Sequence, residues 1–518
     1  MIQRLWSGAK PMLALVLALP MVCVAQAPLA TTASGPVQGL AADGIDGIDV
    51  FRGIPFAAPP VGALRWREPQ PAEKWTAVRQ ATAAGPSCIQ QRGMSLENGG
   101  DPGKLDEDCL YLNVFSPHLE RTARLPVMVW IHGGALVFGS GGLPIYDGSA
   151  LASRDVVVVT INYRLGALGF FSHPGLDREI SGGPVNFGLL DQIAALRWVR
   201  SNIAAFGGDP ARVTIAGQSA GAQSVLALMA SPLTAGLFSG AIAQSPYGIP
   251  SHSRSKAQET GVALAVAVGL AGAQASAASL RSIPADQLAE RGKKLSLAPS
   301  FIVGDEVVPV PLLEAFQKGR EHAVPLVIGS TSADASVVEA FGVDPAVLVQ
   351  KMGTARILVR SLYPGVSDQR QLGREVARDA LFTAFGRRIA YLHSAKAPTW
   401  RYYFNHVGPT ATAGVDAGVL HGGEVPFVLG TLDGCQCIGR PVTPLDHAVE
   451  RRTGDRWAAF VRTHKPAGAV DWPIDDRRRG QVLEIGDEDT ARPGFMAPRL
   501  NAFIAALNFA GRKSRSDY

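Results

Sequence analysis

The order of apolar and polar residues predicts a strand, a sharp turn and a helix in direct succession. Residues 212–216 (Arg-Val-Thr-Ile-Ala) have the composition of a strand, and 222–228 are compatible with a helix. Between them lie five small or polar residues, 217–221, which cannot continue either pattern without a change of direction. Similar strand-like runs occur at 127–129, 324–329 and 400–404.

The turn in this pattern reads Gly217-Gln218-Ser219-Ala220-Gly221, a G-x-S-x-G sequence. A serine on a strand-to-helix turn must hold a strained backbone, and small residues two places before and after it remove clashing side chains. Such a turn exposes the serine Oγ at a helix N-terminus. The bare pattern also occurs in ordinary glycine-rich turns, but the strand before it and the helix after it favour a nucleophile elbow. Ser219 is therefore the candidate nucleophile of an α/β-hydrolase.

In α/β-hydrolases the nucleophile is followed along the chain by the acid and then by the histidine. Five histidines lie far enough beyond Ser219 to qualify: His393, His406, His421, His447 and His464. His421 is the best candidate, because it lies in the glycine-containing loop 418–424, where an imidazole can be aimed at a serine. The alternative role for His421 is to cap or brace this loop.

The candidate acid is the first carboxylate after the strand-like segment 324–329, which is Asp334. An acid here would hold the imidazole tautomer and stabilise the imidazolium. Asp334 could instead interact with a helix dipole. Glu339 is the next carboxylate, but it falls within 337–341, which resembles the following helix.

The candidate oxyanion hole lies in the sequence Trp130-Ile131-His132-Gly133-Gly134-Ala135, directly after the apolar strand-like segment 127–129. Consecutive glycines let backbone N–H groups approach a developing oxyanion, and the residue after the nucleophile supplies another donor. The expected donors are the N–H groups of Gly134, Ala135 and Ala220.

Taken together, these motifs resemble the type-B carboxylesterases, the family that includes cholinesterases and bacterial para-nitrobenzyl esterases. The resemblance implies the α/β-hydrolase fold, with a central, mostly parallel sheet flanked by helices. Further segments that match the family run along nearly the whole mature chain: 51–57, 107–114, 186–192 and 206–210.

Transferred residue by residue, the family's His-Gly-x-Glu motif falls on His421 and Glu424. Its acid, five places beyond a glycine that follows a strand, falls on Asp334, where most members carry glutamate. The family's oxyanion residues fall on Gly133, Gly134 and Ala135.

The resemblance also implies a disulfide between Cys88 and Cys109. Cholinesterases place an aromatic cation site within this loop, but residues 89–108 contain no Phe, Tyr or Trp, so a choline ester is not expected. Cys435 and Cys437 could form a strained bridge or stay as free thiols, and they lack the spacing of a zinc site.

The N-terminus has the features of a signal peptide, with Arg4 and Lys10 before the apolar stretch 12–24. Residues 1–25 are predicted to be removed and the mature chain to be secreted or periplasmic. Cys23 lacks the preceding small residue of a lipoprotein signal. After the N-terminus no apolar stretch is long enough to span a membrane.

Composition agrees with a globular enzyme. Of 518 residues, 47% are hydrophobic and 18% charged, and no linker-like tract divides the chain. We expect a single catalytic domain at 26–511 and a disordered tail at 512–518. The net charge is only +5, and the basic residues are scattered along the chain. This pattern does not favour nucleic-acid binding.

The sequence predicts a secreted serine carboxylesterase that uses neither a metal nor another cofactor and acts on a small-molecule ester through an acyl-enzyme. An amidase or thioesterase could use the same triad, and a specialised member could hydrolyse large polyol esters such as fumonisins. A non-catalytic member would be expected to lack the serine or the histidine. The pocket rim is expected to include Leu136, Val137, Phe138 and the segments around Tyr247 and Phe341.

Overall fold

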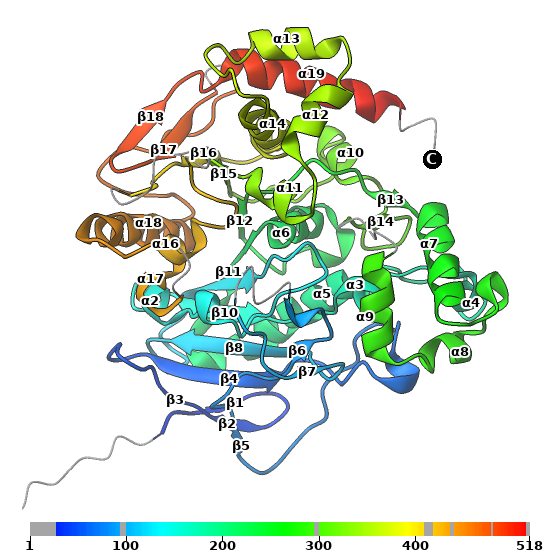
Figure 1. Ribbon diagram of the computed structural model, residues 1–518. Helices are drawn as coiled ribbons and strands as arrows, with labels where there is room; N and C mark the ends of the chain where they lie inside the picture. Colours follow the sequence, from blue (N-terminus) through cyan, green and yellow to red (C-terminus); the bar gives the residue numbers. More distant parts are fainter. Residues whose placement is uncertain are drawn as a thin grey trace, which may run out of the picture.

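The computed structural model describes residues 27–93, 100–294, 300–408, 418–435, 440–477 and 480–513. Within them, one sheet of eleven strands runs through the molecule (Figure 1). In spatial order its strands are β18 (Asp489–Arg492), β17 (Val482–Ile485), β16 (Thr399–Phe404), β15 (Leu326–Thr331), β12 (Gly240–Gln244), β11 (Gly208–Gln218), β9 (Leu125–Ile131), β10 (Val157–Ile161), β8 (Tyr111–Ser116), β4 (Asp49–Pro55) and β3 (Leu40–Ala41).

The centre of this sheet is parallel. All neighbouring pairs from β10 across to β17 are parallel, whereas β8, β4, β3 and β18 join in antiparallel pairs at the two edges. The predicted α/β-hydrolase fold with a mostly parallel sheet is confirmed.

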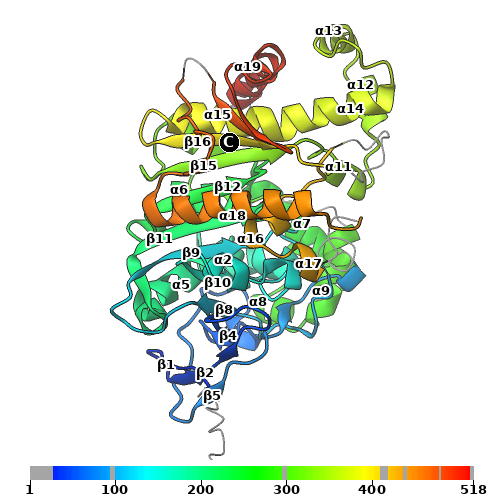
Figure 2. The ribbon, with the colours of Figure 1, turned by 90° about the vertical axis from the view of Figure 1, so that its left-hand side faces the viewer.

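Helices cover both faces of the sheet, and the alternation of side chains along β9 shows why. Val127, Val129 and Ile131 pack in one apolar core with residues of α5 (Phe187–Asn202) and α6 (Ala220–Ala230). Met128 and Trp130 point the other way, into a core shared with α18 (Pro444–Thr463). Because successive strand residues face opposite sides, a wholly apolar strand must be covered twice. Figure 2 shows α18 lying across the face of the sheet opposite α6.

The remaining elements surround this core. A third, smaller apolar cluster joins α12 (Pro345–Lys351), α14 (Gln369–Arg378) and α19 (Ala497–Lys513) at one end of the molecule. The other helices are α2 (Ser149–Ala152), α3 (Gly166–Gly169), α4 (Pro174–Asp177), α7 (Arg254–Ala267), α8 (Ala277–Arg281), α9 (Ala285–Lys294), α10 (Leu312–Gln317), α11 (Ser336–Ala340), α13 (Ala355–Ser361), α15 (Ala384–His393), α16 (Val425–Leu429) and α17 (Leu432–Cys435). Short strands form three small sheets: β1 (Leu29–Thr31) with β2 (Pro36–Gln38) and β5 (Arg79–Gln80), β6 (Ser87–Cys88) with β7 (Leu105–Asp106), and β13 (His252–Ser253) with β14 (Ile302–Val303).

The structure describes neither the first 26 residues nor the last five. The signal segment lies outside the described residues, as do 514–518. The last helix, α19, continues to Lys513, two residues into the segment expected to be a disordered tail. In the part of the chain that the structure describes, no helix is both long and apolar enough to cross a membrane.

Cys88 and Cys109 form a disulfide with a Cα–Cα distance of 4.9 Å. The loop they close is tied to the segment after β9 by Gln90, whose Nε2 donates to the Gly139 carbonyl at 2.8 Å and whose Oε1 accepts from the Gly139 N–H at 2.8 Å. Cys435 is also disulfide-bonded, while Cys437 lies outside the described residues.

Replacing both Cys88 and Cys109 with serine is expected to lower the free energy of unfolding by about 3 kcal/mol, because the bridge closes a loop of 21 residues. Urea denaturation of the oxidised wild type and the double variant measures this difference. Equal denaturation midpoints would show that the bridge contributes nothing to stability.

Candidate active site

Ser219 lies at the turn between β11 and α6. Its φ of 58° and ψ of −122° lie in a region that residues with a side chain rarely adopt. Its N–H donates to the Gln244 carbonyl at 2.8 Å, which ties the turn to the neighbouring strand β12.

The two flanking glycines are required by close packing. A Cβ on Gly217 would lie 2.6 Å from the backbone carbon of Gly221, and a Cβ on Gly221 would lie 2.0 Å from the Ile131 carbonyl oxygen. Both contacts are shorter than atoms allow, so this sharp turn excludes side chains at these two positions.

The loop after β9 passes directly beside Ser219. A Cβ on Gly133 would lie 3.2 Å from the Ser219 Cβ. The following residues have left-handed backbone angles, with φ of 100° at Gly134, 53° at Ala135 and 63° at Leu136. Three successive residues in the left-handed region give the loop a tight turn beside Ser219.

Three N–H groups near the serine have no protein partner within the described residues, those of Gly134, Ala135 and Ala220. The Gly133 backbone, in contrast, hydrogen-bonds the Tyr146 hydroxyl. The three N–H groups expected from the sequence to be donors are therefore free in the described residues, whereas the backbone of Gly133 is occupied by Tyr146.

His132 is a buried, structural histidine. Burial lowers the pKa of its imidazole to about 4, and its ring stacks on Tyr163 with a centroid distance of 4.3 Å. The Tyr163 hydroxyl donates to the His132 carbonyl at 2.8 Å. These contacts fix the start of the loop that carries Gly134.

The structure brings His421 and Asp334 into contact, with 2.8 Å between Nδ1 and Oδ1. Asp334 is fully buried, and its second oxygen accepts from the Thr331 N–H at 2.8 Å. The aspartate reaches the imidazole even though its side chain is one methylene shorter than a glutamate.

Three further hydrogen bonds join the segment around Asp334 to the loop around His421. The Ala333 N–H donates to the Val419 carbonyl, the Val419 N–H to Ser332 Oγ, and the His421 N–H to Ser336 Oγ, at 2.8, 2.8 and 2.9 Å. Neither serine can be recognised from the sequence, because residues about 85 positions apart give no local signal that they will meet.

Glu339, the other candidate acid, makes no hydrogen bond to His421 in the described part of the chain. It lies in α11 and pairs with Arg370 and Arg374. Hydrogen bonds from Arg374 and Arg370 lower the pKa of its carboxyl to about 2.

Glu424, which the family motif pairs with His421, is fully buried behind the site. Its Oε1 accepts from Gln244 Nε2 at 3.1 Å and from the Tyr402 hydroxyl at 3.4 Å, while Oε2 has no hydrogen-bond partner in the described residues. Burial, followed by the charge of Asp334, raises the pKa of Glu424 to about 7.

One aromatic residue packs against His421 that the sequence gives no signal for. Phe382 belongs to a π-helical turn, Asp379–Thr383, and its ring centroid is 5.1 Å from that of His421. Tyr247 packs edge-on against Phe382 at 6.4 Å. Phe341, expected at the rim, has a side chain that is 45% exposed.

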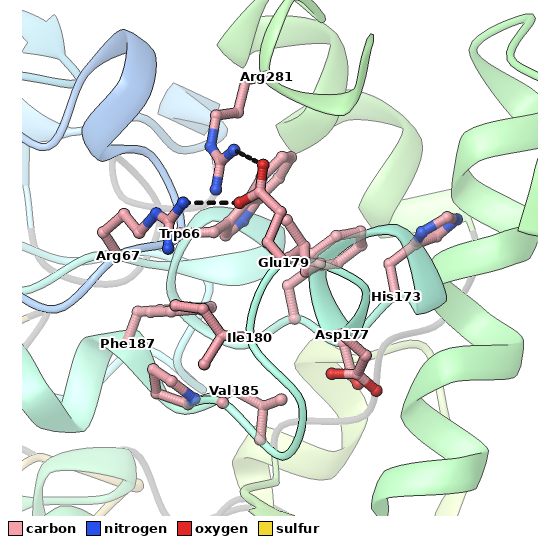
Figure 3. Close-up of a pocket in the computed structure, with 14 residues that line it drawn as sticks. Trp66, Arg67, His173, Asp177, Glu179, Ile180, Val185, Phe187 and Arg281 are labelled. Carbon is pink, nitrogen blue, oxygen red and sulfur yellow. Dashed lines mark hydrogen bonds and ion pairs between the residues drawn. The ribbon is translucent and has the colours of Figure 1, made fainter. Parts of the chain in front are cut away.

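A separate small pocket lies near α4 and the start of α5 (Figure 3). Its volume is about 20 Å³, and none of the candidate site residues line it. Glu179 accepts there from Arg67 at 2.7 Å and from Arg281 at 2.9 Å, so these charged groups satisfy one another. A cavity of this size holds about one water and not an ester.

Comparison with known proteins agrees with this geometry. A model of the carboxylesterase family matches residues 26–369 and 364–503. The chain is 35% identical to fumonisin B1 esterase of Sphingopyxis macrogoltabida, over 88% of this chain and 86% of that protein. It is 34% identical to para-nitrobenzyl esterase of Bacillus subtilis, over 89% and 95% of the two chains. A solved para-nitrobenzyl esterase structure superposes with a TM-score of 0.80 at 32% identity, covering 92% of this chain and 99% of the other.

The fold and these matches define an α/β-hydrolase. The chain belongs to the carboxylesterase family, and it is a carboxylic ester hydrolase.

Glu424→Gln is expected to make stability less dependent on pH. The unfolded carboxyl loses its proton near pH 4.5, whereas the folded one keeps it to about pH 7, so this group lowers stability as the pH rises between these values. From pH 5 to pH 8 the wild type should lose about 2 to 3 kcal/mol more than the variant. Urea denaturation of both proteins at the two pH values tests this, and an identical loss in both would contradict a buried, neutral Glu424.

Proposed function

We propose that this protein is a secreted serine carboxylesterase that acts through a Ser219–Asp334–His421 triad and an acyl-enzyme intermediate. Three observations support the proposal: a strained serine turn, unpaired backbone N–H groups beside it, and an imidazole that is hydrogen-bonded to a buried carboxylate and lies 3.2 Å from the side-chain amide of the residue before the serine. Each feature supplies one requirement of acyl transfer: a nucleophile, an oxyanion site and an oriented base.

In the first half-reaction, Ser219 Oγ attacks the ester carbonyl carbon as its proton passes to His421 Nε2. The carbonyl oxygen becomes an oxyanion, which Gly134, Ala135 and Ala220 stabilise through their N–H groups. The tetrahedral intermediate collapses, the carbon–oxygen bond to the alcohol breaks, and the imidazolium gives its proton to the departing alkoxide. Asp334 keeps the proton of Nδ1 in place and stabilises the imidazolium.

In the second half-reaction a water molecule takes the place of the alcohol. His421 removes its proton, the hydroxyl attacks the acyl carbon, and the bond to Ser219 Oγ breaks as the serine recovers its proton. The products are the carboxylic acid and the free enzyme.

The substrate is a small-molecule ester, and two classes are candidates. The similarity to a para-nitrobenzyl esterase of B. subtilis supports simple aryl and alkyl esters as the first class for this chain. The similarity to a fumonisin B1 esterase supports large polyol esters as the second. A hydrolysis screen that varies acyl and alcohol size independently, with matched amides and thioesters, separates these classes and the amidase and thioesterase alternatives.

We also propose that the mature enzyme is one catalytic domain, residues 26–511, exported from the cytoplasm. The Cys88–Cys109 disulfide supports export, because disulfides persist in oxidising compartments. Recovery of the processed protein from culture medium or periplasm tests export directly.

Ser219→Ala is expected to lower kcat for a para-nitrophenyl ester by about 10⁶-fold, because it removes the nucleophile and leaves only binding and the oxyanion site. Steady-state hydrolysis measures the loss, with the exposed Ser153→Ala as a control that should retain full activity. An organophosphonate should label the wild type at Ser219. Substantial hydrolysis by the Ser219→Ala variant would refute the nucleophile assignment.

Asp334→Asn is expected to fold normally but to lower kcat on the order of 10⁴-fold, because a neutral amide no longer fixes the imidazole tautomer. Glu339→Gln is the matched control and should leave kcat nearly unchanged, since Glu339 pairs with Arg370 and Arg374. Both are measured as kcat at neutral pH. Nearly normal turnover by Asp334→Asn, beside a severe loss in Glu339→Gln, would move the acid to Glu339.

A further inference from the structure

The hydrogen bond to Asp334 determines which nitrogen of His421 can act as a base. Nδ1 lies 2.8 Å from Oδ1 of Asp334, whose other oxygen already accepts from the Thr331 N–H. A carboxylate of this kind only accepts, so Nδ1 carries a hydrogen. In the neutral imidazole the available lone pair is therefore on Nε2.

That lone pair is covered by Gln218, the residue before the proposed nucleophile. The Gln218 amide nitrogen lies 3.2 Å from His421 Nε2. Because Nε2 accepts in the neutral ring, the amide N–H donates to it. Within the residues that the structure describes, Ser219 Oγ makes no hydrogen bond to His421.

The Gln218 side chain is held in this place by packing. Gln218 ends β11 and is only 6% exposed. Its amide lies between two glycines: a Cβ on Gly133 would lie 3.0 Å from Oε1, and a Cβ on Gly422 would lie 3.4 Å from Nε2. The amide thus lies between the loop of the oxyanion site and the loop of the histidine.

We propose that Gln218 is a positioning residue for His421, which holds the neutral imidazole ready in the resting enzyme by donating to Nε2 and releases it when substrate arrives. This inference rests on the proposed function, because it assigns His421 as the base.

The proposal implies a change of hydrogen bonding during turnover. When Ser219 Oγ gives its proton to Nε2, that nitrogen becomes a donor and can no longer accept from the amide. The Gln218 N–H group therefore has to move away from Nε2 as the proton arrives. No atom or electron is gained or lost by Gln218 in this exchange.

Two carboxylates face His421 and act on its charge. Asp334 contacts Nδ1, and Glu424 interacts with the ring through space from the buried side. Both favour the imidazolium when they are ionised. The Gln218 N–H opposes them, since it stabilises only the neutral ring.

The test is the pH dependence of kcat/KM for three variants at Gln218. Gln218→Met keeps the length of the side chain but removes the donor, and the acid limb of the profile should move to higher pH. Gln218→Glu places a negative charge beside Nε2, and the acid limb should move further, by about one pH unit or more. Gln218→Asn retains the amide but withdraws it by one methylene, and should resemble the Met variant.

A merely structural role for Gln218 would lower kcat/KM at every pH and leave the acid limb unmoved, and that result would overturn the proposal. ¹⁵N NMR of histidine-labelled enzyme gives a readout independent of turnover: the Nε2 resonance of His421 should shift in the Met variant, and an unchanged resonance would also overturn the proposal. The Ser219→Ala variant distinguishes failure of the proposed role of Gln218 from failure of the proposed esterase function. Loss of hydrolysis there, beside unmoved profiles at Gln218, would refute this inference alone, whereas retained hydrolysis would refute the proposed function.

Discussion

The site is built around the strained backbone at Ser219. A positive φ at a residue with a side chain costs on the order of 1 to 3 kcal/mol, and it persists only where the surroundings overdetermine it. Here the constraints are the glycine contacts on either side of the turn and the hydrogen bond from the Ser219 N–H to the Gln244 carbonyl of the next strand. The strained turn places Ser219 between the end of β11 and the start of α6.

The parallel centre of the sheet brings the other groups to the same edge. Strands β9, β11, β15 and β16 all run in one direction, so the loops that follow their carboxyl ends gather on one side (Figure 1). Sites in open α/β sheets form at this edge. The loop after β9 carries Gly134, the segment after β15 carries Asp334, and the chain beyond β16 returns with His421. The parallel direction of the central strands therefore brings together residues that are about 290 positions apart in the sequence.

Behind the proposed triad lies a buried polar network that connects the Ser219 backbone to Glu424. Gln244 holds the Ser219 N–H with its backbone carbonyl and Glu424 with its side chain, and its Oε1 accepts from Trp457 Nε1 at 2.9 Å. Removing these polar groups from water costs free energy, and the hydrogen-bonded network offsets that cost while it fixes one geometry. Glu424 faces Asp334 across this network, and the neutral state that burial favours spares the core a second negative charge beside the first.

The amino-acid sequence by itself determined the parts of the site that have a local physical cause. The turn at Ser219, the glycines before Ala135 and the loop around His421 each need particular small residues at particular spacings, and the sequence displays them. Asp334 could be chosen over Glu339 because one follows a strand and the other falls in a helix. Only the tertiary structure placed Gln218 against His421, Ser336 under the His421 N–H and Phe382 beside the ring. The reason is physical: these contacts join segments that are distant in sequence, or depend on which way a side chain turns, and neither distance across the fold nor rotamer choice is encoded in periodicity or spacing.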